Sequence, residues 1–387
     1  MINEIASELS ALAAKLNIQD RVIFSDNDFL EEIRSVAPFG KVVVLYSVPE
    51  LSEKVGSLTE RLKAAGIKPL NFVIPVKAPL NLDDVLEIVG LPEDVRAIVA
   101  TELELMPIAS YLATVLNIPV IHALNSVNTE GLLLPKVEIK SRGGTDFFTT
   151  TCNYRIVLNG VPTLGDLAEQ YISVISKLTA LSDYRLKLDV CGGKPAADAY
   201  AAIKDAVLSA FSAEAPDALM LAGLKIELAN FSAGGEIILN SAEYSFKRIM
   251  GFKRQKGLTF ALLEKLLTLY KFSAEEREDP FLVPDYNKRA QELSAALNLD
   301  DGAFLNGLLT QLKMLKKRGD VLSLKTKFLN ELTSQENALF KIERKYQTLG
   351  GTRLSDFSPY LTAFTLCGDL PDTVNLMTLA RESGFTE

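Results

Sequence analysis

The chain has 387 residues, of which 48% are hydrophobic and 23% are charged, and its formal net charge is −8. This length suits two domains, and the ordinary composition predicts a well-packed globular protein. The acidic balance argues against a surface built for nucleic acid or for an anionic membrane, because such surfaces need clustered lysine and arginine.

The opening segment and the cysteines bear on location. Apolar residues at the start of the chain are interrupted by Glu4, Glu8 and Lys15, so the continuous apolar run of a signal peptide is missing. No stretch reaches the roughly 18 apolar residues of a membrane helix. The three cysteines are far apart and odd in number, which favours a reducing compartment. We therefore expect a cytoplasmic protein without a membrane segment.

Short apolar runs alternate with amphipathic segments through the first half of the chain. The runs rich in β-branched residues predict strands at residues 41–48, 71–75, 96–100 and 118–124. The segments with helical spacing predict helices at residues 50–65, 83–91 and 108–116. This alternation predicts a parallel sheet, whose function is normally set at the carboxyl ends of its strands.

The pattern changes after the first 160 residues. Residues 136–160 alternate like strands around a Gly-Gly turn and are expected to close the first domain, whereas helical spacing dominates from residue 164 onward, including residues 195–211 and 217–230. We expect an α/β fold: an N-terminal Rossmann-like parallel-sheet domain, residues 1–163, followed by an all-helical C-terminal domain, residues 164–387.

The most informative helix runs from residue 166 to residue 188. Its apolar residues recur at three- and four-residue steps and predict a buried helix: Leu167, Tyr171, Val174, Ile175, Leu178, Leu181 and Leu186. Its second half, SKLTALSDYRL, resembles the pattern GDLLSKxTALADWRL of the dehydroquinate synthase-like superfamily. That superfamily includes the iron-containing alcohol dehydrogenases, and the resemblance is nearest to the glycerol-1-phosphate dehydrogenases.

The resemblance implies a metal site in the helical domain that this chain has lost. The family binds a divalent metal through the Asp of its Gly-Asp pair and through two histidines. Ser173 stands at the Asp, Tyr244 and Arg248 stand at the two histidines of the pattern SGxEHxxSH, and Lys256 replaces the histidine of a later helix. The whole chain contains one histidine, His122, so no two-histidine metal site can form. We expect no metal, and a packed or surface role for His122.

The resemblance also implies a cofactor turn that is altered here. The family carries a glycine-rich turn, roughly GGGTxxD, whose amides approach the cofactor diphosphate. The corresponding residues 101–107, TELELMP, contain no glycine, and they include Thr101, Glu102 and Glu104. The two carboxylates would repel a diphosphate, so no NAD(P) is expected. The other interpretation is an ordinary loop that leads into a helix.

A third segment resembles the family pattern ISVPTxxSxDG. In residues 121–135, Asn125 stands where a threonine contacts the nicotinamide cofactor, and Glu130 with Gly131 stands where Asp-Gly lines the substrate pocket. Together with Asn128, Asn125 and Glu130 are candidates for a pocket. A polar loop with nothing bound is the other interpretation.

Five cations lie within ten residues of one another near the lost histidines: Lys247, Arg248, Lys253, Arg254 and Lys256. Fixed cations in the space of a lost metal would hold a phosphate or a carboxylate. The other interpretation is a solvated turn between helices.

Three functions follow from these patterns. The first is a degenerate, non-catalytic member of the superfamily, which binds a small anion in the cleft between its domains or acts as a homo-oligomer or with a protein partner. The second is an active NAD(P)-dependent, metal-dependent polyol or polyol-phosphate dehydrogenase of the iron-containing type. The third is a metal-free lyase with Lys256 or Tyr244 as acid or base.

Overall fold

The computed structural model describes residues 2–47, 52–74, 80–81, 94–141, 144–158, 194–210, 215–239, 241 and 244, with scattered positions between 167 and 188. The chain forms two compact units: Met1–Val174 with Ala197–Gly235, called here the sheet unit, and Ile175–Ala196 with Glu236–Glu387. The predicted boundary between residues 163 and 164 lies outside the described residues and stays a prediction. Most of the predicted all-helical domain lies outside them as well.

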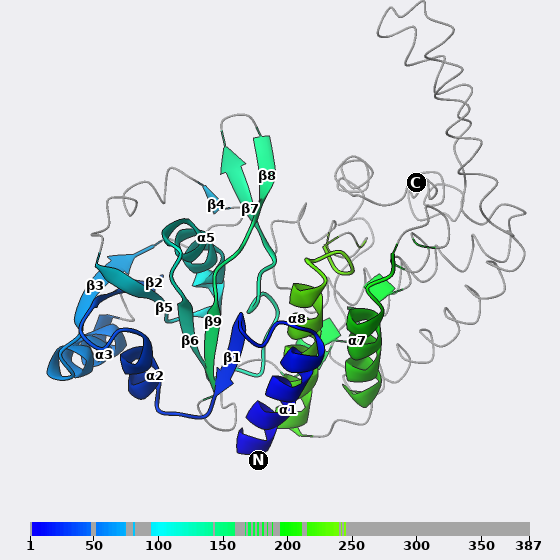
Figure 1. The fold of residues 1–387 in the computed structure, drawn as a ribbon, viewed down its shortest axis with the longest axis horizontal. Helices are drawn as coiled ribbons and strands as arrows, with labels where there is room; N and C mark the ends of the chain where they lie inside the picture. Colours follow the sequence, from blue (N-terminus) through cyan, green and yellow to red (C-terminus); the bar gives the residue numbers. More distant parts are fainter. Residues whose placement is uncertain are drawn as a thin grey trace, which may run out of the picture. The chain divides into compact units, whose positions relative to one another are not determined.

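The sheet unit contains a six-stranded sheet in the order β1-β9-β6-β5-β2-β3, and every neighbouring pair is parallel (Figure 1). Its strands are β1 (Val22–Ser25), β2 (Lys41–Tyr46), β3 (Lys68–Val73), β5 (Val95–Ala100), β6 (Val120–Leu124) and β9 (Tyr154–Leu158). The predicted Rossmann-like α/β domain is therefore confirmed.

The four strands predicted from apolar runs correspond to β2, β3, β5 and β6. In β2 the four central residues, 42–45, have no exposed surface, as expected of a strand covered on both faces. The prediction was least accurate for β3, which begins three residues earlier than predicted, at Lys68. The helix predicted at residues 83–91 lies outside the described residues.

A smaller three-stranded sheet has the order β4-β7-β8. Strands β7 (Lys136–Ser141) and β8 (Gly144–Thr149) pair antiparallel, as their sequence alternation predicts, and β4 (Leu80–Asn81) runs parallel to β7. Strand β9 follows the hairpin in sequence but pairs with β1 and β6 in the main sheet. The predicted strands are confirmed, and the last of them completes the main sheet.

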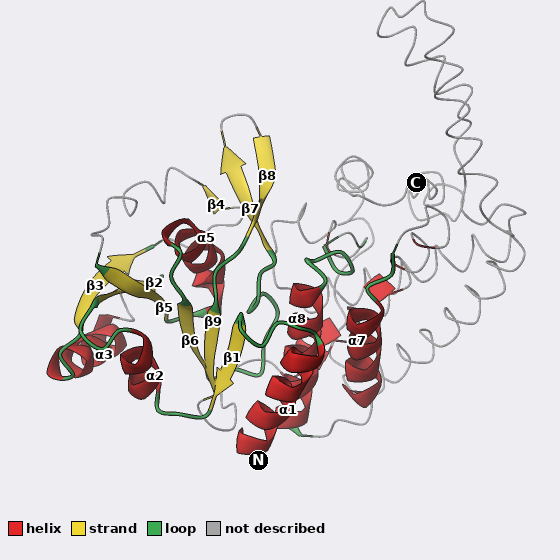
Figure 2. Cartoon of the chain, in the orientation of Figure 1, coloured by secondary structure: helices red, strands yellow, loops and turns green. Residues whose placement is uncertain are grey.

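The described helices are α1 (Ile2–Lys15), α2 (Phe29–Val36), α3 (Ser52–Ala64), α5 (Met106–Leu116), α7 (Ala197–Ala210) and α8 (Pro216–Ser232), with the 3-10 helix η2 (Leu103–Leu105) (Figure 2). None of the helices in this described part is long and apolar enough to cross a membrane. The predicted helices at 50–65, 108–116, 195–211 and 217–230 correspond to α3, α5, α7 and α8.

Helices α7 and α8 belong to the same compact unit as the sheet. Helix α8 packs against α7 and α1, and α1 also packs against β1 (Figure 1). The guanidinium of Arg21 lies 4.5 Å from the ring centre of Phe231 on α8, a favourable cation–π geometry. The N-terminal helix therefore joins the helical segment 197–235 to the edge of the sheet.

Every described position between Leu167 and Leu188 is helical, which agrees with the predicted helix. Tyr171, Val174 and Leu181 are almost fully buried. Leu167, however, is 42% exposed, so the apolar stripe begins one turn later than predicted. This helix brings polar side chains to the candidate site described below.

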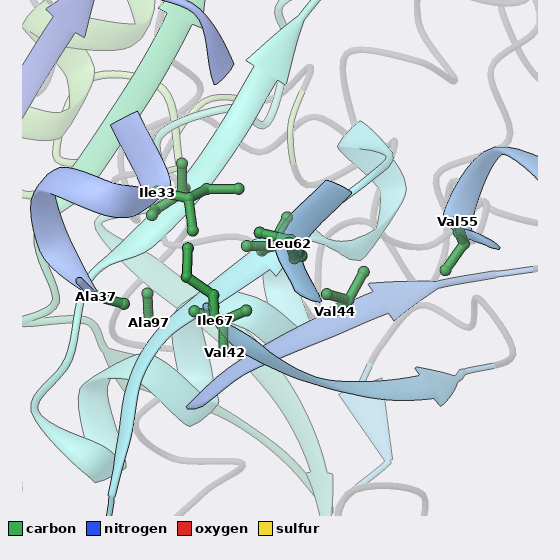
Figure 3. Close-up of a cluster of buried hydrophobic side chains, with 10 residues drawn as sticks. Ile33, Ala37, Val42, Val44, Val55, Leu62, Ile67 and Ala97 are labelled. Carbon is green, nitrogen blue, oxygen red and sulfur yellow. The ribbon is translucent and has the colours of Figure 1, made fainter. Parts of the chain in front are cut away.

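Apolar side chains of α2, α3, β2 and β5 meet in one buried cluster, which Figure 3 shows in close-up. The labelled members are Ile33, Ala37, Val42, Val44, Val55, Leu62, Ile67 and Ala97. Because side chains alternate along a strand, Val43 and Leu45 face the other side of the sheet. Burying one Ile or Leu side chain of this kind contributes about 1.5–3 kcal/mol, so the cluster holds α2 and α3 firmly on the sheet.

A charged pair joins α2 to strand β9 of the main sheet. Arg155 on β9 donates from Nη1 to Oε1 of Glu32 at 2.6 Å, and Asn27 donates from Nδ2 to the other oxygen at 3.4 Å. The Glu32 side chain is only 4% exposed. A carboxylate at such a depth needs these partners, so the pair fixes where α2 lies.

Candidate functional site

The strand order creates a topological switch point between β2 and β5, which are neighbours in the sheet (Figure 1). From β2 the chain passes through α3 to β3 on one side, and from β5 it passes through α5 to β6 on the other side. The two connections therefore diverge. Ligands of open α/β sheets normally bind in the crevice at such a point, outside the carboxyl ends of the strands.

At this point the turn after β5 is folded tightly against the end of β2. The backbone N–H and the hydroxyl of Thr101 both donate to the Leu45 carbonyl, at 3.2 and 2.9 Å. The next residue, Glu102, accepts the Ser47 backbone N–H on its Oε2 at 2.9 Å. Residues 103–105 then form η2, which leads directly into α5. The segment is thus a hydrogen-bonded turn that leads into a helix.

His122 lies beside this turn, near the end of β6. Its side chain is buried, and its Nδ1 lies 2.9 Å from the Ala100 carbonyl of β5, which can only accept a hydrogen bond. Burial lowers the pKa of His122 below 6.5, although the Ala100 carbonyl and the charge of Glu104 act in the opposite direction. The imidazole is therefore neutral at pH 7 and donates from Nδ1 to the strand end. This is the packed role expected for His122.

The loop after β6 is held by a helix of the same unit. Gln170 accepts the Thr129 backbone N–H on Oε1 at 3.3 Å and donates from Nε2 to the Thr129 hydroxyl at 3.0 Å. One turn later on this helix, Ser173 donates from its hydroxyl to Oε2 of Glu130 at 2.9 Å. Positions three residues apart share a helix face, so Gln170 and Ser173 reach consecutive loop residues.

Helix α8 holds the other end of this loop. Glu227 accepts the Leu133 backbone N–H on Oε2 at 3.1 Å, and both groups are buried. Between the two fixed points, Gly131 has φ +87°, a left-handed conformation that glycine adopts without strain. The loop after β6 is therefore fixed at both of its ends.

The backbone of α8 at Gly223 lies very close to the side chains of Gln170 and Thr129. A Cβ atom at this position would overlap the side-chain amide of Gln170 and the hydroxyl of Thr129. Gln170 and Thr129 are both almost completely buried. Only a residue without a side chain lets α8 lie this close to their hydrogen bonds.

The structure brings together two of the six predicted cleft residues, Glu130 and Ser173. Asn125 is exposed at the start of the same loop. Tyr244 is half-buried and helical, and its backbone N–H donates to Ser241 at 3.2 Å, but it belongs to the other compact unit. Arg248 and Lys256 lie outside the described residues, as do the other three members of the five-cation cluster.

Sequence reasoning missed Gln170, Gly223 and Glu227 as parts of this site. Glu227 had a visible signal, because it is the one carboxylate in the apolar run from residue 218 to residue 230. Such a lone buried charge needs a hydrogen-bond partner. Gln170 and Gly223 had no comparable signal, because their role depends on how close α8 comes to the loop.

Comparison with known proteins gives matches in structure only. No protein-family model matches the chain, and no curated protein matches its sequence. An archaeal halo-thermophilic alcohol dehydrogenase from a Red Sea brine pool matches with a TM-score of 0.56 and 12% identity, over 94% of this chain and 96% of that chain. An iron-containing alcohol dehydrogenase from Thermococcus thioreducens matches with a TM-score of 0.56 and 11% identity, over 95% and 98%.

This chain has the fold of the iron-containing alcohol dehydrogenases. A maleylacetate reductase from Rhizobium sp. shares the fold as well, with a TM-score of 0.50 and 15% identity over 94% of each chain. The predicted resemblance is confirmed at this level. The nearer likeness to glycerol-1-phosphate dehydrogenases and the loss of the family motifs stay predictions.

The iron-containing alcohol dehydrogenase fold raises the question of a metal. By the resemblance, the position of Ser173 would carry a metal-binding Asp. Two carboxylates this close would repel each other unless a cation lay between them. The Ser173 hydroxyl instead donates to Glu130 and needs no cation. Among the described residues, no group of three His, Cys, Asp or Glu side chains could hold a metal ion. The described donors do not fit the metal of this fold.

The cofactor implied by this fold fits the described residues no better. A dinucleotide diphosphate needs free backbone N–H groups at the strand ends and close access to them. At the switch point the Ser47 N–H donates to the Glu102 carboxylate, and the turn that follows β5 contains bulky side chains. The Glu102 carboxylate at the switch point would therefore repel the negatively charged diphosphate of the cofactor.

Proposed function

We propose that this chain is a non-catalytic member of the glycerol-1-phosphate dehydrogenase and dehydroquinate synthase-like superfamily, which binds a small anionic ligand or a partner protein. The observation that carries the proposal is the hydrogen bond from Ser173 to Glu130 at 2.9 Å. It gives the Glu130 carboxylate a neutral hydrogen-bond donor at the position where the resemblance implies a metal-binding Asp. The count of one histidine in the whole sequence supports the same conclusion.

The second candidate function is an active NAD(P)-linked, metal-dependent polyol or polyol-phosphate dehydrogenase. The observation that favours it is the fold, because alcohol dehydrogenases match over nearly the whole chain. Such an enzyme would need a metal site with at most one histidine and a dinucleotide site without a glycine turn. The chemistry of the described residues favours the non-catalytic function.

Metal content and turnover test the proposal on the full chain. After exposure to excess zinc, iron or nickel and extensive dialysis, we expect less than about one metal ion per ten chains, because such sites need three or four protein ligands. Neither NAD+ nor NADP+ should be reduced in the presence of glycerol or glycerol phosphate. Turnover that rises in step with added metal would refute the proposal.

Ser173→Asp is the matched variant for the metal argument. It places a second carboxylate beside Glu130, so its melting temperature should rise on addition of a divalent cation, since a ligand that binds only the folded chain stabilises it. Ser173→Ala and the unmodified chain should show no such rise. An equal rise in all three proteins would mean that the cation binds elsewhere.

The anionic ligand is tested with inorganic phosphate. If the basic cluster of residues 247–256 holds an anion, phosphate should raise the melting temperature of the full chain at constant ionic strength. Arg248→Ala and Lys256→Ala should each reduce this rise, and Lys63→Ala, a change at an exposed lysine of α3, should leave it unchanged. An undiminished rise in both cluster variants would exclude the cluster as the site.

A cytoplasmic location, and a homo-oligomeric state or a protein partner, stay predictions.

A further inference from the structure

Glu102 lies at the switch point, where ligands of open α/β sheets normally bind. Its Oε2 accepts the Ser47 backbone N–H at 2.9 Å, at the end of β2. A backbone N–H at the carboxyl end of such a strand is a natural donor to an anion. In this chain the donor already has an anionic partner, and that partner is supplied by the chain itself.

The charge of Glu102 also lies at the amino end of a helical segment. Glu102 directly precedes η2, and η2 leads into the 11-residue helix α5. The amino end of a helix carries a partial positive charge that attracts phosphates. Glu102 and Glu104 place two carboxylates in the short segment that precedes α5. Glu102 is thus the residue that both accepts the Ser47 N–H and lies before the amino end of α5, the two features that would attract a diphosphate.

The charge of Glu102 has no ion-pair partner among the described residues. The Glu102 side chain makes its hydrogen bond to a neutral backbone group and forms no ion pair within the described part of the chain. The neighbouring His122 is neutral at pH 7 because burial lowers its pKa. Glu102 is half-buried, so water screens its charge less than that of the exposed Glu104.

We propose that Glu102 is the specificity-determining residue that excludes dinucleotides from the switch point. The inference rests on the proposed function, because it explains why the chain keeps this fold without its cofactor. An approaching diphosphate would meet an uncompensated carboxylate and would have to break the hydrogen bond between Glu102 and Ser47. Both effects depend on the Glu102 side chain. A single substitution at this residue therefore tests them without restoring glycines to the turn.

The test is NADH binding to the full chain, measured by fluorescence titration. Glu102→Gln keeps an oxygen for the Ser47 N–H and removes the charge, so the dissociation constant for NADH should fall by about tenfold. Glu102→Gly also removes the bulk and should lower it at least as far. Glu104→Gln, a charge removal at an exposed residue, should change it by less than about threefold because its charge is screened.

Ionic strength provides the second readout. If exclusion is electrostatic, the difference between the unmodified chain and Glu102→Gln should shrink between about 0.01 and about 0.5 M salt. A purely structural role of Glu102 predicts no such change. Should Glu102→Gly fail to fold, the Gln variant decides the matter, with circular dichroism and melting temperature as checks on folding.

The outcomes separate this inference from the proposed function. A folded Gln variant that binds NADH no better than the unmodified chain overturns the role of Glu102 and leaves the proposed function intact. An unmodified chain that binds NADH as tightly as the variants also overturns that role. Metal-dependent turnover by the unmodified chain would refute the proposed function, whatever the binding measurements show.

Discussion

Arg155→Ala should lower the free energy of unfolding of the sheet unit by about 3 kcal/mol, because it leaves a buried carboxylate without its cationic partner. In the folded chain the guanidinium of Arg155 donates to Glu32 at 2.6 Å, and Glu32 is nearly inaccessible to water. The remaining donors, Ser25 and Asn27, are neutral, and Asn27 lies at 3.4 Å. Urea unfolding followed by circular dichroism measures the loss.

Arg61→Ala is the matched control, because it removes the same side chain from an exposed pair. Arg61 lies 3.4 Å from Asp28, and both side chains are more than half exposed. Exposed pairs of this kind contribute less than about 1 kcal/mol. Equal losses in the two variants would show that the Arg155–Glu32 pair gains nothing from its burial.

The effect of Arg155→Ala should depend on pH. Burial alone raises the pKa of Glu32, but hydrogen bonds from Arg155, Ser25 and Asn27, with the charge of Arg155, outweigh it and hold the pKa below 4.5. A carboxyl with a lowered folded-state pKa stabilises the fold above its ordinary pKa and loses this contribution as the pH falls through the folded-state pKa. The difference between the two proteins should therefore be largest near neutral pH and shrink as the pH falls through the folded-state pKa values of Glu32 in the variant and then in the unmodified chain. A difference that grows in acid would contradict the assignment.

The parallel sheet could be predicted in part because its central strands are covered on both faces. Strands β2, β5 and β6 are continuous apolar runs, and this pattern marks them in the sequence. Strand β1 has only four residues, one of them the 37% exposed Ile23, and gives no such pattern. The position of β9 between β1 and β6 depends on pairing with residues far away in the sequence. Local patterns do not contain that information.

The same limit applies to the candidate site. The resemblance of residues 121–135 and 173–188 to a known family pointed to Glu130 and Ser173, and the structure places them within hydrogen-bond distance. The charge of Glu102 was visible in the sequence. Its hydrogen bond to Ser47 was not, because it requires β5 to lie beside β2. Sequence therefore identifies the chemical groups, and strand order decides which of them meet.

Gly223→Ala should destabilise the sheet unit by about 1–3 kcal/mol, because a methyl group has no room between α8 and the loop after β6. The added carbon would overlap the Gln170 amide and the Thr129 hydroxyl. Gly56→Ala is the matched control, also within a helix, where an added Cβ meets nothing within 4 Å. That change should stabilise α3 by about 0.5–1 kcal/mol, since alanine is the better helix former. The two substitutions should therefore have opposite signs.

A double-mutant cycle shows whether the loss at Gly223 arises at the loop or within the helix. Thr129→Ala removes the hydroxyl that the new methyl group would overlap, so part of the loss should be recovered in the combination of Thr129→Ala with Gly223→Ala. A favourable coupling of about 0.5 kcal/mol or more would place the strain at the contact between α8 and the loop. Strict additivity would show that the Thr129 hydroxyl is not the source of the strain and would leave the Gln170 amide or α8 itself. The loop that carries Glu130 is therefore held by close packing against Gly223 of α8 as well as by hydrogen bonds, and the coupling free energy of the cycle measures how much this packing contributes to stability.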